Sequence, residues 1–203
     1  MGLFLDAAGA WNDLRNVSYI FEVARKGVLK RIELSFLAED FPHLAGMQYA
    51  RDVDFGIRPA EYYGAKLVPA LLSGKMKDHR IETSRNWDKI SGRLTAIIHL
   101  QNTLDGNFVI VSFDKAKVKG YSQIDAEFAI RSTISDDIYF VFLDKRSGRY
   151  YCKSAFRKDI TDYAENQSPM TILQKIKIVD AQSSILFCRE GYQPDDTITD
   201  KIQ

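Results

Sequence analysis

The chain has 203 residues, a formal net charge of +1, 45% apolar residues and 27% charged residues. This composition is typical of a globular protein with one sizeable core, and the near-neutral charge argues against a dedicated DNA-binding protein. The longest apolar runs are too short to span a bilayer, and the N-terminus lacks the basic start of a secretion signal. We therefore expect a cytoplasmic protein without membrane contact, whose cysteines, Cys152 and Cys188, are buried free thiols.

The first part of the chain predicts one helix followed by a hairpin. Apolar residues recur at helical spacing between residues 3 and 15, with polar side chains on the opposite face. Segments 17–24 and 28–36 then alternate apolar and polar residues, as half-buried antiparallel strands do. Gly27 supplies the permissive backbone for the tight turn between them. This hairpin should join the sheet that the helix covers.

The next part carries a strand end, a histidine and several short elements. Segment 31–46 runs from an apolar strand into an acidic turn and places His43 at the start of a short helix. Glycine and proline recur between residues 47 and 69, which indicates short helices joined by loops. Residues 69–74 predict another brief helix, with proline in its first turn and glycine at its end.

The second half predicts one long helix and then strands. Thr83 or Ser84 would cap a helix that runs to about residue 105. Beta-branched and aromatic residues, separated by turn signals, predict strands at 108–113, 122–134, 138–143, 150–156, 171–179 and 184–188. Helices early and antiparallel strands late predict an α+β fold, with helices packed on a curved sheet. We expect one domain over residues 1–190 and a polar tail over 191–203.

His43 is the first candidate for chemistry. It follows Pro42 at a junction between strand and helix, and a neutral imidazole can take a proton near neutral pH. The alternative is a histidine that only forms a hydrogen bond at a helix start. His79 lies in a polar loop and His99 lies mid-helix among apolar neighbours, so neither is a strong candidate. No two histidines have ligand spacing, and we expect no metal site and no cofactor.

A second group of candidates surrounds the predicted strand 150–156. Lys153 and Arg157 carry charges that suit a phosphate, and Ser154 or Tyr163 could donate a hydrogen bond to it. Strand alternation predicts that Lys153 points to one face and Ser154 to the other, together with Cys152. The alternative is a solvated strand edge with no ligand.

Three lysines form a third candidate. Lys115, Lys117 and Lys119 alternate with apolar residues and would share one face of an extended segment. Such a stripe could follow a nucleic-acid backbone. It could equally be an exposed strand edge that lysine keeps soluble, which is a common device.

Several short motifs, taken in order, resemble a family of phage and mobile-element proteins. The matching residues are Phe36, Phe41-Pro42-His43-Leu44-Ala45-Gly46, Ser91-Gly92-Arg93-Leu94, Tyr139-Phe140-Val141-Phe142-Leu143, Ser154-Ala155-Phe156 and Asp162-Tyr163. The family consists of predicted nucleases of the Barnase–EndoU–Colicin–RelE-like fold, often carried within polyvalent proteins. The resemblance spans roughly residues 10–180.

The resemblance implies a metal-independent endoribonuclease that acts as a toxin or effector in the cytoplasm of a bacterial host cell. Its substrate would be RNA, such as tRNA or mRNA, and a host or immunity protein would be a further partner. His43 would act as base or acid, with Arg93 and Lys153 stabilising charge on the phosphate. Ser154 and Tyr163 would donate hydrogen bonds to it.

Other interpretations stay open from the sequence alone. Arg93 could instead pair with Glu33 or Glu39. The protein could be a non-catalytic phage or mobile-element protein that binds and inhibits a host protein or nucleic acid, or a transferase acting on a nucleotide cofactor. The nuclease interpretation predicts that the side-chain tips of His43 and Lys153 approach within roughly 10 Å, since both must reach one phosphate. The strand ending at Phe36 should then lie beside strand 150–156.

Overall fold

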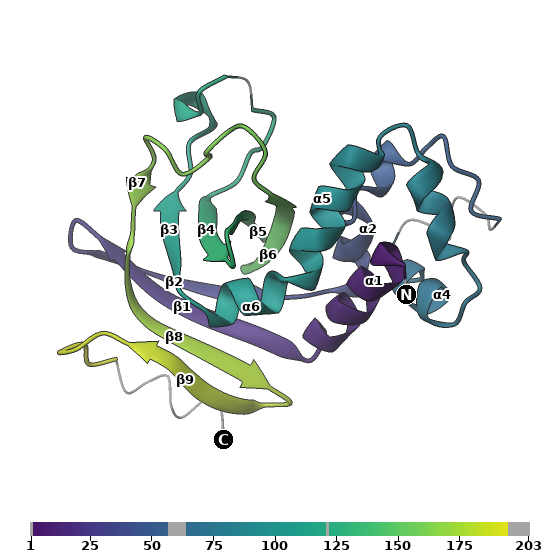
Figure 1. Ribbon diagram of the computed structural model, residues 1–203. Helices are drawn as coiled ribbons and strands as arrows, with labels where there is room; N and C mark the ends of the chain where they lie inside the picture. Colours follow the sequence, from purple (N-terminus) through teal and green to yellow (C-terminus); the bar gives the residue numbers. More distant parts are fainter. Residues whose placement is uncertain (1, 57–63, 121, 195–203) are drawn as a thin grey trace.

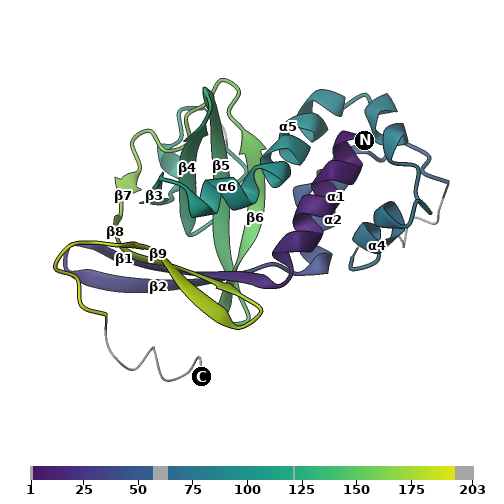
Figure 2. The same ribbon diagram turned by 60° about the horizontal axis from the view of Figure 1, so that its bottom comes forward.

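The structure is a computed structural model, and it describes residues 2–56, 64–120 and 122–194. Nine strands form one strongly curled sheet in the order β7-β3-β4-β5-β6-β2-β1-β8-β9. Figures 1 and 2 show that this sheet has two differently oriented parts, one formed by β3 to β6 and the other by β1, β2, β8 and β9. Most helices gather beside β6. The expected α+β fold, with helices on a curved and mostly antiparallel sheet, is therefore confirmed.

The strands follow the predicted order closely. They are β1 Val17–Arg25, β2 Val28–Ser35, β3 Phe108–Ser112, β4 Phe128–Ile134, β5 Asp137–Arg146, β6 Arg149–Arg157, β7 Ser168–Pro169, β8 Thr171–Val179 and β9 Gln182–Cys188. The β1–β2 hairpin turns at Lys26 and Gly27, whose φ angles of 50° and 78° both lie in the left-handed region. This is the turn geometry that matches the twist of a two-residue hairpin. The two-residue edge strand β7 was not predicted.

Two of the described helices, α1 and α5, have 12 residues each, and the others are shorter. The helices are α1 Leu3–Leu14, α2 Phe41–Leu44, α4 Leu67–Leu72, α5 Trp87–Ile98 and α6 Leu100–Asp105, with the 3-10 helices η1 Ala38–Asp40, η2 Met47–Tyr49, η3 Asp78–Thr83 and η4 Lys115–Lys117. The N-terminal helix and the helix near residues 69–74 are confirmed. No helix in the described parts of the chain is long and apolar enough to cross a bilayer.

The predicted helix over 84–105 is wrong in two respects. It begins only at Trp87, with Asn86 as its N-cap, while the Ser84 hydroxyl before it donates to Asp52 at 2.9 Å and accepts from the Asn86 amide at 3.2 Å. It is also interrupted at His99, whose φ and ψ of −90° and 2° divide it into α5 and α6. Both pieces still bury apolar residues in the main core, including Leu94 and Leu104.

Two other expectations need correction. Strand β4 starts at Phe128 rather than at residue 122, and the amide of Ile124 donates to the Ser122 hydroxyl in the preceding loop. A serine that satisfies local backbone in this way competes with strand pairing. Cys188 is exposed, because β9 is the outermost strand, whereas Cys152 is buried as expected; both thiols are free. Of the predicted tail over 191–203, residues 195–203 lie outside the described residues.

The sheet segment from β3 to β6 buries apolar side chains on both faces. The face toward the helices joins the main core, which includes Trp11, Phe41 and Leu94. The opposite face forms a second, smaller core around Phe140 and Phe142, against which Phe156 and Tyr163 pack. The loop after β6 thereby folds back over the strand that precedes it, and this return positions the site described next.

Candidate functional site

The candidate site lies along a free stretch of the edge of β6. Strands β2 and β6 are paired in parallel only at Leu34 and Tyr150, so the rest of β6 has no strand partner on that side. Helices α2 and α5 pack against β6 instead. The predicted proximity of the strand ending at Phe36 and the strand 150–156 is confirmed, and three separate segments meet at one edge.

Arg93 on α5 is the best-held cation of this site. Its Nη1 donates to Ser154 Oγ at 3.2 Å. The guanidinium carbon lies 5.4 Å from the ring centre of Tyr49 and 5.8 Å from that of Phe156, within cation–π range. Burial lowers the pKa of Arg93, yet no carboxylate in the described chain forms an ion pair with it. A desolvated cation without a carboxylate is a site prepared for an anion.

The alternative pairing of Arg93 with Glu33 or Glu39 is wrong. Glu33 forms its ion pair with Arg31 at 2.7 Å, on its own strand β2. Glu39 is exposed and contributes to the electrostatic environment of Arg146. Neither of these two residues therefore neutralises the charge of Arg93.

Gly46 leaves the room that Arg93 occupies. Its φ is 81°, a left-handed conformation that side chains other than glycine rarely adopt. A Cβ at this position would lie 3.1 Å from Cδ of Arg93 and 3.4 Å from the Tyr49 ring. Gly46, which follows α2, thus allows the backbone to lie directly against the Arg93 side chain of α5.

His43 lies on α2 beside β6, and its side chain is exposed. Partial desolvation lowers the pKa of His43 below its ordinary value, and the positive charges of Arg93 and Lys153 lower it further. Asp40 acts in the opposite direction but does not reverse the shift. The imidazole is therefore neutral at neutral pH, which is the form that accepts a proton.

Lys153 occupies a bulge in β6. Phe142 pairs with Ser154 and Leu143 with Cys152, so Lys153 has no partner on β5. A bulge reorients the side chains of its strand, and the predicted alternation fails here for that reason. Cys152 packs into the main core, whereas Ser154 faces Arg93.

Lys153 is held by an acidic partner. Its Nζ contacts Asp144 Oδ2 at 2.5 Å. Burial alone lowers the pKa of Lys153, but the hydrogen bond and charge of Asp144 outweigh it and raise the pKa overall. Lys153 thus remains a cation beside His43, although one that is partly neutralised.

Ser154 contacts Arg93 directly, and the charge of Arg93 acts on Tyr163. Ser154 is buried, with 5% of its surface exposed, and its hydroxyl oxygen already accepts from Arg93. Its observed contact is with the arginine rather than with an open surface. Burial raises the pKa of Tyr163, and the charge of Arg93 opposes that shift, so its phenol keeps its proton at neutral pH.

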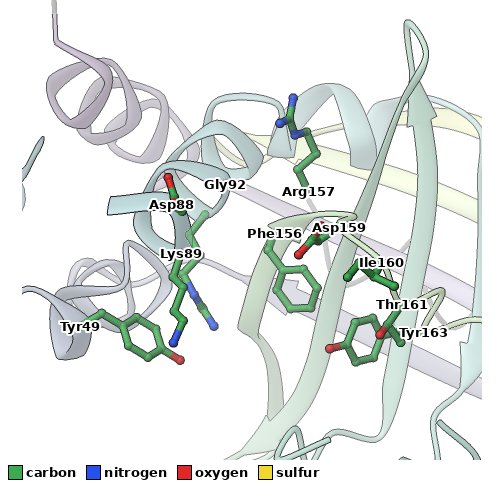
Figure 3. A pocket seen from close by; sticks show the side chains of 11 residues that line it. Tyr49, Asp88, Lys89, Gly92, Phe156, Arg157, Asp159, Ile160, Thr161 and Tyr163 are labelled. Carbon is green, nitrogen blue, oxygen red and sulfur yellow. The ribbon is translucent and has the colours of Figure 1, made fainter. Parts of the chain in front are cut away.

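A pocket of about 430 Å³ opens beside these residues (Figure 3). It is lined by Tyr49, Asp88, Lys89, Gly92, Arg93, Phe156, Arg157, Asp159, Ile160, Thr161 and Tyr163. Of the predicted site residues, Arg93, Arg157 and Tyr163 line it, whereas His43, Lys153 and Ser154 do not. Tyr49 and Tyr163 lie on opposite sides, and their hydroxyl groups are turned toward the space between them (Figure 3).

Sequence reasoning gave no site role to the other eight lining residues, which are Tyr49, Asp88, Lys89, Gly92, Phe156, Asp159, Ile160 and Thr161. A signal for Lys89 exists, because residues four apart on a helix share a face and Lys89 precedes Arg93 by four. Both cations lie beside the Tyr49 ring, with the Lys89 Nζ 5.9 Å from its centre. Phe156 belongs to one of the motifs that resemble the family, whereas Tyr49 has no comparable signal in the sequence.

The predicted lysine stripe is wrong as an extended segment. Lys115 and Lys117 belong to the 3-10 helix η4, which Asp114 caps by accepting from the amide of Ala116. Each lysine also faces a carboxylate: the pairs are Lys115 with Asp125 at 3.2 Å, Lys117 with Asp114 at 4.0 Å, and Lys119 with Glu165. Arg157, at the pocket, pairs with Asp137 at 3.4 Å.

The remaining histidines are placed away from the site. The His79 side chain is 70% exposed in its loop, and the ring of His99 lies 5.2 Å from that of Tyr139. Within the described residues, no three His, Cys, Asp or Glu side chains gather in a group that could hold a metal ion.

Comparison with known families identifies the chain. Residues 4–187 match the model of the family described as phage-Barnase-EndoU-ColicinE5/D-RelE like nuclease4. The chain belongs to this family. As a member of this phage-associated nuclease family, it is expected to act on a nucleic acid. No curated protein and no solved structure matches the chain.

Proposed function

We propose that this nuclease-family protein is a metal-independent endoribonuclease. The observation that carries the proposal is Arg93, a desolvated cation with no carboxylate partner among the described residues. Its charge acts on two groups suited to proton transfer, His43 and Tyr163. A phosphodiester bound to Arg93 would therefore have both a base and an acid nearby.

The chemistry assigns one role to each group. Neutral His43 accepts the proton of the ribose 2′-hydroxyl, and that oxygen attacks the adjacent phosphorus. Arg93 and Lys153 stabilise the negative charge that grows on the phosphate oxygens. The bond from phosphorus to the 5′-oxygen then breaks, and the phenol of Tyr163 donates its proton to the leaving oxygen. The products are a 2′,3′-cyclic phosphate and a 5′-hydroxyl, and water returns the proton from His43 to Tyr163.

Protein cations supply the charge that a divalent metal supplies in other nucleases. Arg93, Lys153 and Lys89 all lie along this edge of the sheet, and Ser154 holds the first of them in place. Because the phosphate can be neutralised by these side chains, the reaction should proceed in the presence of a chelator. The biological role that fits is a toxin or effector acting on RNA, such as tRNA or mRNA, in the cytoplasm of a bacterial host.

The test is cleavage of RNA by purified protein in excess chelator, with analysis of the product ends. We expect 2′,3′-cyclic phosphate ends, and His43→Ala should lower the rate by at least about a hundredfold, as loss of a general base does. Products with linear 3′-phosphates formed only when divalent metal is added would contradict the proposal.

A second candidate function is a non-catalytic protein that binds a host or immunity protein. The paired lysines favour it, because Lys115, Lys117 and Lys119 each face a carboxylate and leave little free positive charge near η4. RNA binding distinguishes the two, since neutralised phosphates release counterions and make the affinity fall with salt. Capture of a protein partner together with no RNA affinity at low salt would favour this second function.

A further inference from the structure

The pocket adjoins the proposed reacting centre, and only part of that centre lines it. Arg93 and Tyr163 line the pocket, whereas His43 and Lys153, which also act on the phosphate in the proposed mechanism, do not. A phosphodiester held at Arg93 would therefore leave the pocket free for another part of the same nucleotide. We infer that this pocket binds an unpaired nucleobase beside the scissile phosphate, which makes RNA with an unpaired nucleotide at the cleavage point the substrate class.

The walls of the pocket have the chemistry of a base-stacking site. Tyr49 comes from η2, whereas Phe156 and Tyr163 come from β6 and the loop after it (Figure 3). The rings of Phe156 and Tyr163 meet edge to face at 5.3 Å, and Phe156 also stacks on Phe142 at 5.4 Å. The second core thus holds these rings in place. Proteins that bind single-stranded RNA stack unpaired bases on aromatic side chains of this kind.

The size of the pocket fits one nucleotide. Its volume of about 430 Å³ lies within the usual range of small-ligand sites, roughly 300–1,000 Å³. A base inside a duplex is stacked and paired, and it must leave the helix before it can enter such a pocket. An unpaired nucleotide in a loop or single strand avoids most of that cost.

Two rim residues have side chains that the fold itself does not use. Ile160 is 88% exposed, which places an aliphatic side chain in water at the mouth of the pocket. A base lying over it would remove that surface from water. Asp159 is exposed, and its carboxylate makes no hydrogen bond or ion pair with the described residues. A carboxylate only accepts hydrogen bonds, so it suits the N–H groups on the edge of a base.

The inference rests on the proposed function for the position of the phosphate, but its test does not require cleavage. A single-stranded dinucleotide with a 2′-O-methyl group cannot undergo 2′-hydroxyl attack, and its affinity can be measured by calorimetry for each of the four bases. The matched probe has the same phosphodiester and no base on the nucleotide next to it. Wild-type protein should bind the base-bearing probe at least about tenfold more tightly, because stacking on aromatic side chains contributes that much per base.

Variants at the rim separate the pocket from general effects on the fold. Ile160→Ser should weaken binding of the base-bearing probe by about threefold or more and leave the probe without a base unaffected. Val109→Ser is the control, because Val109 is 48% exposed on β3 and does not line this pocket. Asp159→Asn should change the order of preference among the four bases, since an amide donates as well as accepts.

The outcomes also separate this inference from the proposed function. Base-dependent binding without RNA cleavage would support the pocket and overturn the catalytic proposal. RNA cleavage with equal affinity for both probes would overturn the pocket and leave the catalytic proposal standing. Equal effects of Ile160→Ser and Val109→Ser, or cleavage in duplex RNA as fast as in the same sequence left unpaired, would also overturn the inference.

Discussion

Two regions of this molecule carry positive charge, and they differ in what lies opposite that charge. In the region around η4, each of Lys115, Lys117 and Lys119 faces an aspartate or glutamate. At the edge of β6, Arg93 faces two aromatic rings and a serine, with no carboxylate partner among the described residues. The first arrangement neutralises its own charge, whereas the second leaves a cation for a ligand. Density of lysine in a sequence is therefore a poorer guide to a phosphate site than the partners that the fold supplies.

The largest expected effect comes from removing the cation of the second region. Arg93→Gln keeps a side chain that can bond to Ser154 but removes the charge. RNA cleavage should fall by about a hundredfold to a thousandfold, as it does when a donor to the transition state is lost. Arg93→Lys is the matched control and should retain more activity than Arg93→Gln. Comparable losses in the two variants would mean that shape, rather than charge, is what Arg93 provides.

The next effect concerns the proton donor beside Arg93. Tyr163→Phe removes only the hydroxyl and keeps the ring that packs against Phe156. Cleavage should fall by about a hundredfold while the melting temperature stays close to that of the wild type. Tyr151→Phe on β6 serves as the control, because Tyr151 does not line the pocket, and it should change the rate by no more than about twofold. Unchanged cleavage in Tyr163→Phe would assign the acid role elsewhere.

An intermediate effect should follow from crowding Arg93 without removing it. Gly46→Ala places a methyl group 3.1 Å from Arg93 Cδ and imposes a left-handed backbone on alanine. The backbone conformation should cost about 1–2 kcal/mol of unfolding free energy. Displacement of the guanidinium should lower cleavage by about tenfold, since small errors of position are costly in catalysis. Gly27→Ala has a similar φ of 78° far from the site, and it should lose stability without a comparable loss of activity.

The smallest effect is expected in the first region. Replacement of Lys115, Lys117 and Lys119 together by glutamine should change RNA affinity by less than about threefold, because their carboxylate partners already compete with phosphate. Lys89→Gln, by contrast, should reduce the slope of affinity against salt by about one, as the loss of one phosphate contact does. If the triple variant reduced the slope by about three, the charged region around η4 would be part of the RNA-binding surface.

The sequence predicts the frame of the fold well, and it predicts the site in part. The N-terminal helix, the first hairpin and most later strands follow from local periodicity, which depends on near neighbours in the chain. The position of His43 beside the strand of Lys153 could be proposed because the family motifs suggested it. The carboxylate partners of Lys115 and Lys119 could not be predicted, because Asp125 and Glu165 lie 10 and 46 residues away from them along the chain.

The remaining misses also have physical causes. The bulge at Lys153 cancels the two-residue period from which strand faces are predicted, so Cys152 and Ala155 both enter the main core. Tyr49 becomes part of the pocket only because the chain folds α5 and η2 together, and no local pattern records that contact. Packing between distant segments decides these features, and they cannot be predicted from the local pattern of a single sequence.

The pH dependence of RNA cleavage tests the central claim most directly, because it depends on the state of His43 and on its cationic neighbours. Burial, Arg93 and Lys153 lower the pKa of His43. The value of kcat/KM should therefore rise with pH, with the midpoint of the rise below pH 6.5 and a plateau above it. Lys153→Gln removes one of those charges, and its midpoint should move to higher pH. A rate that falls through this range in the wild type, or a midpoint that stays in place in Lys153→Gln, would contradict the account.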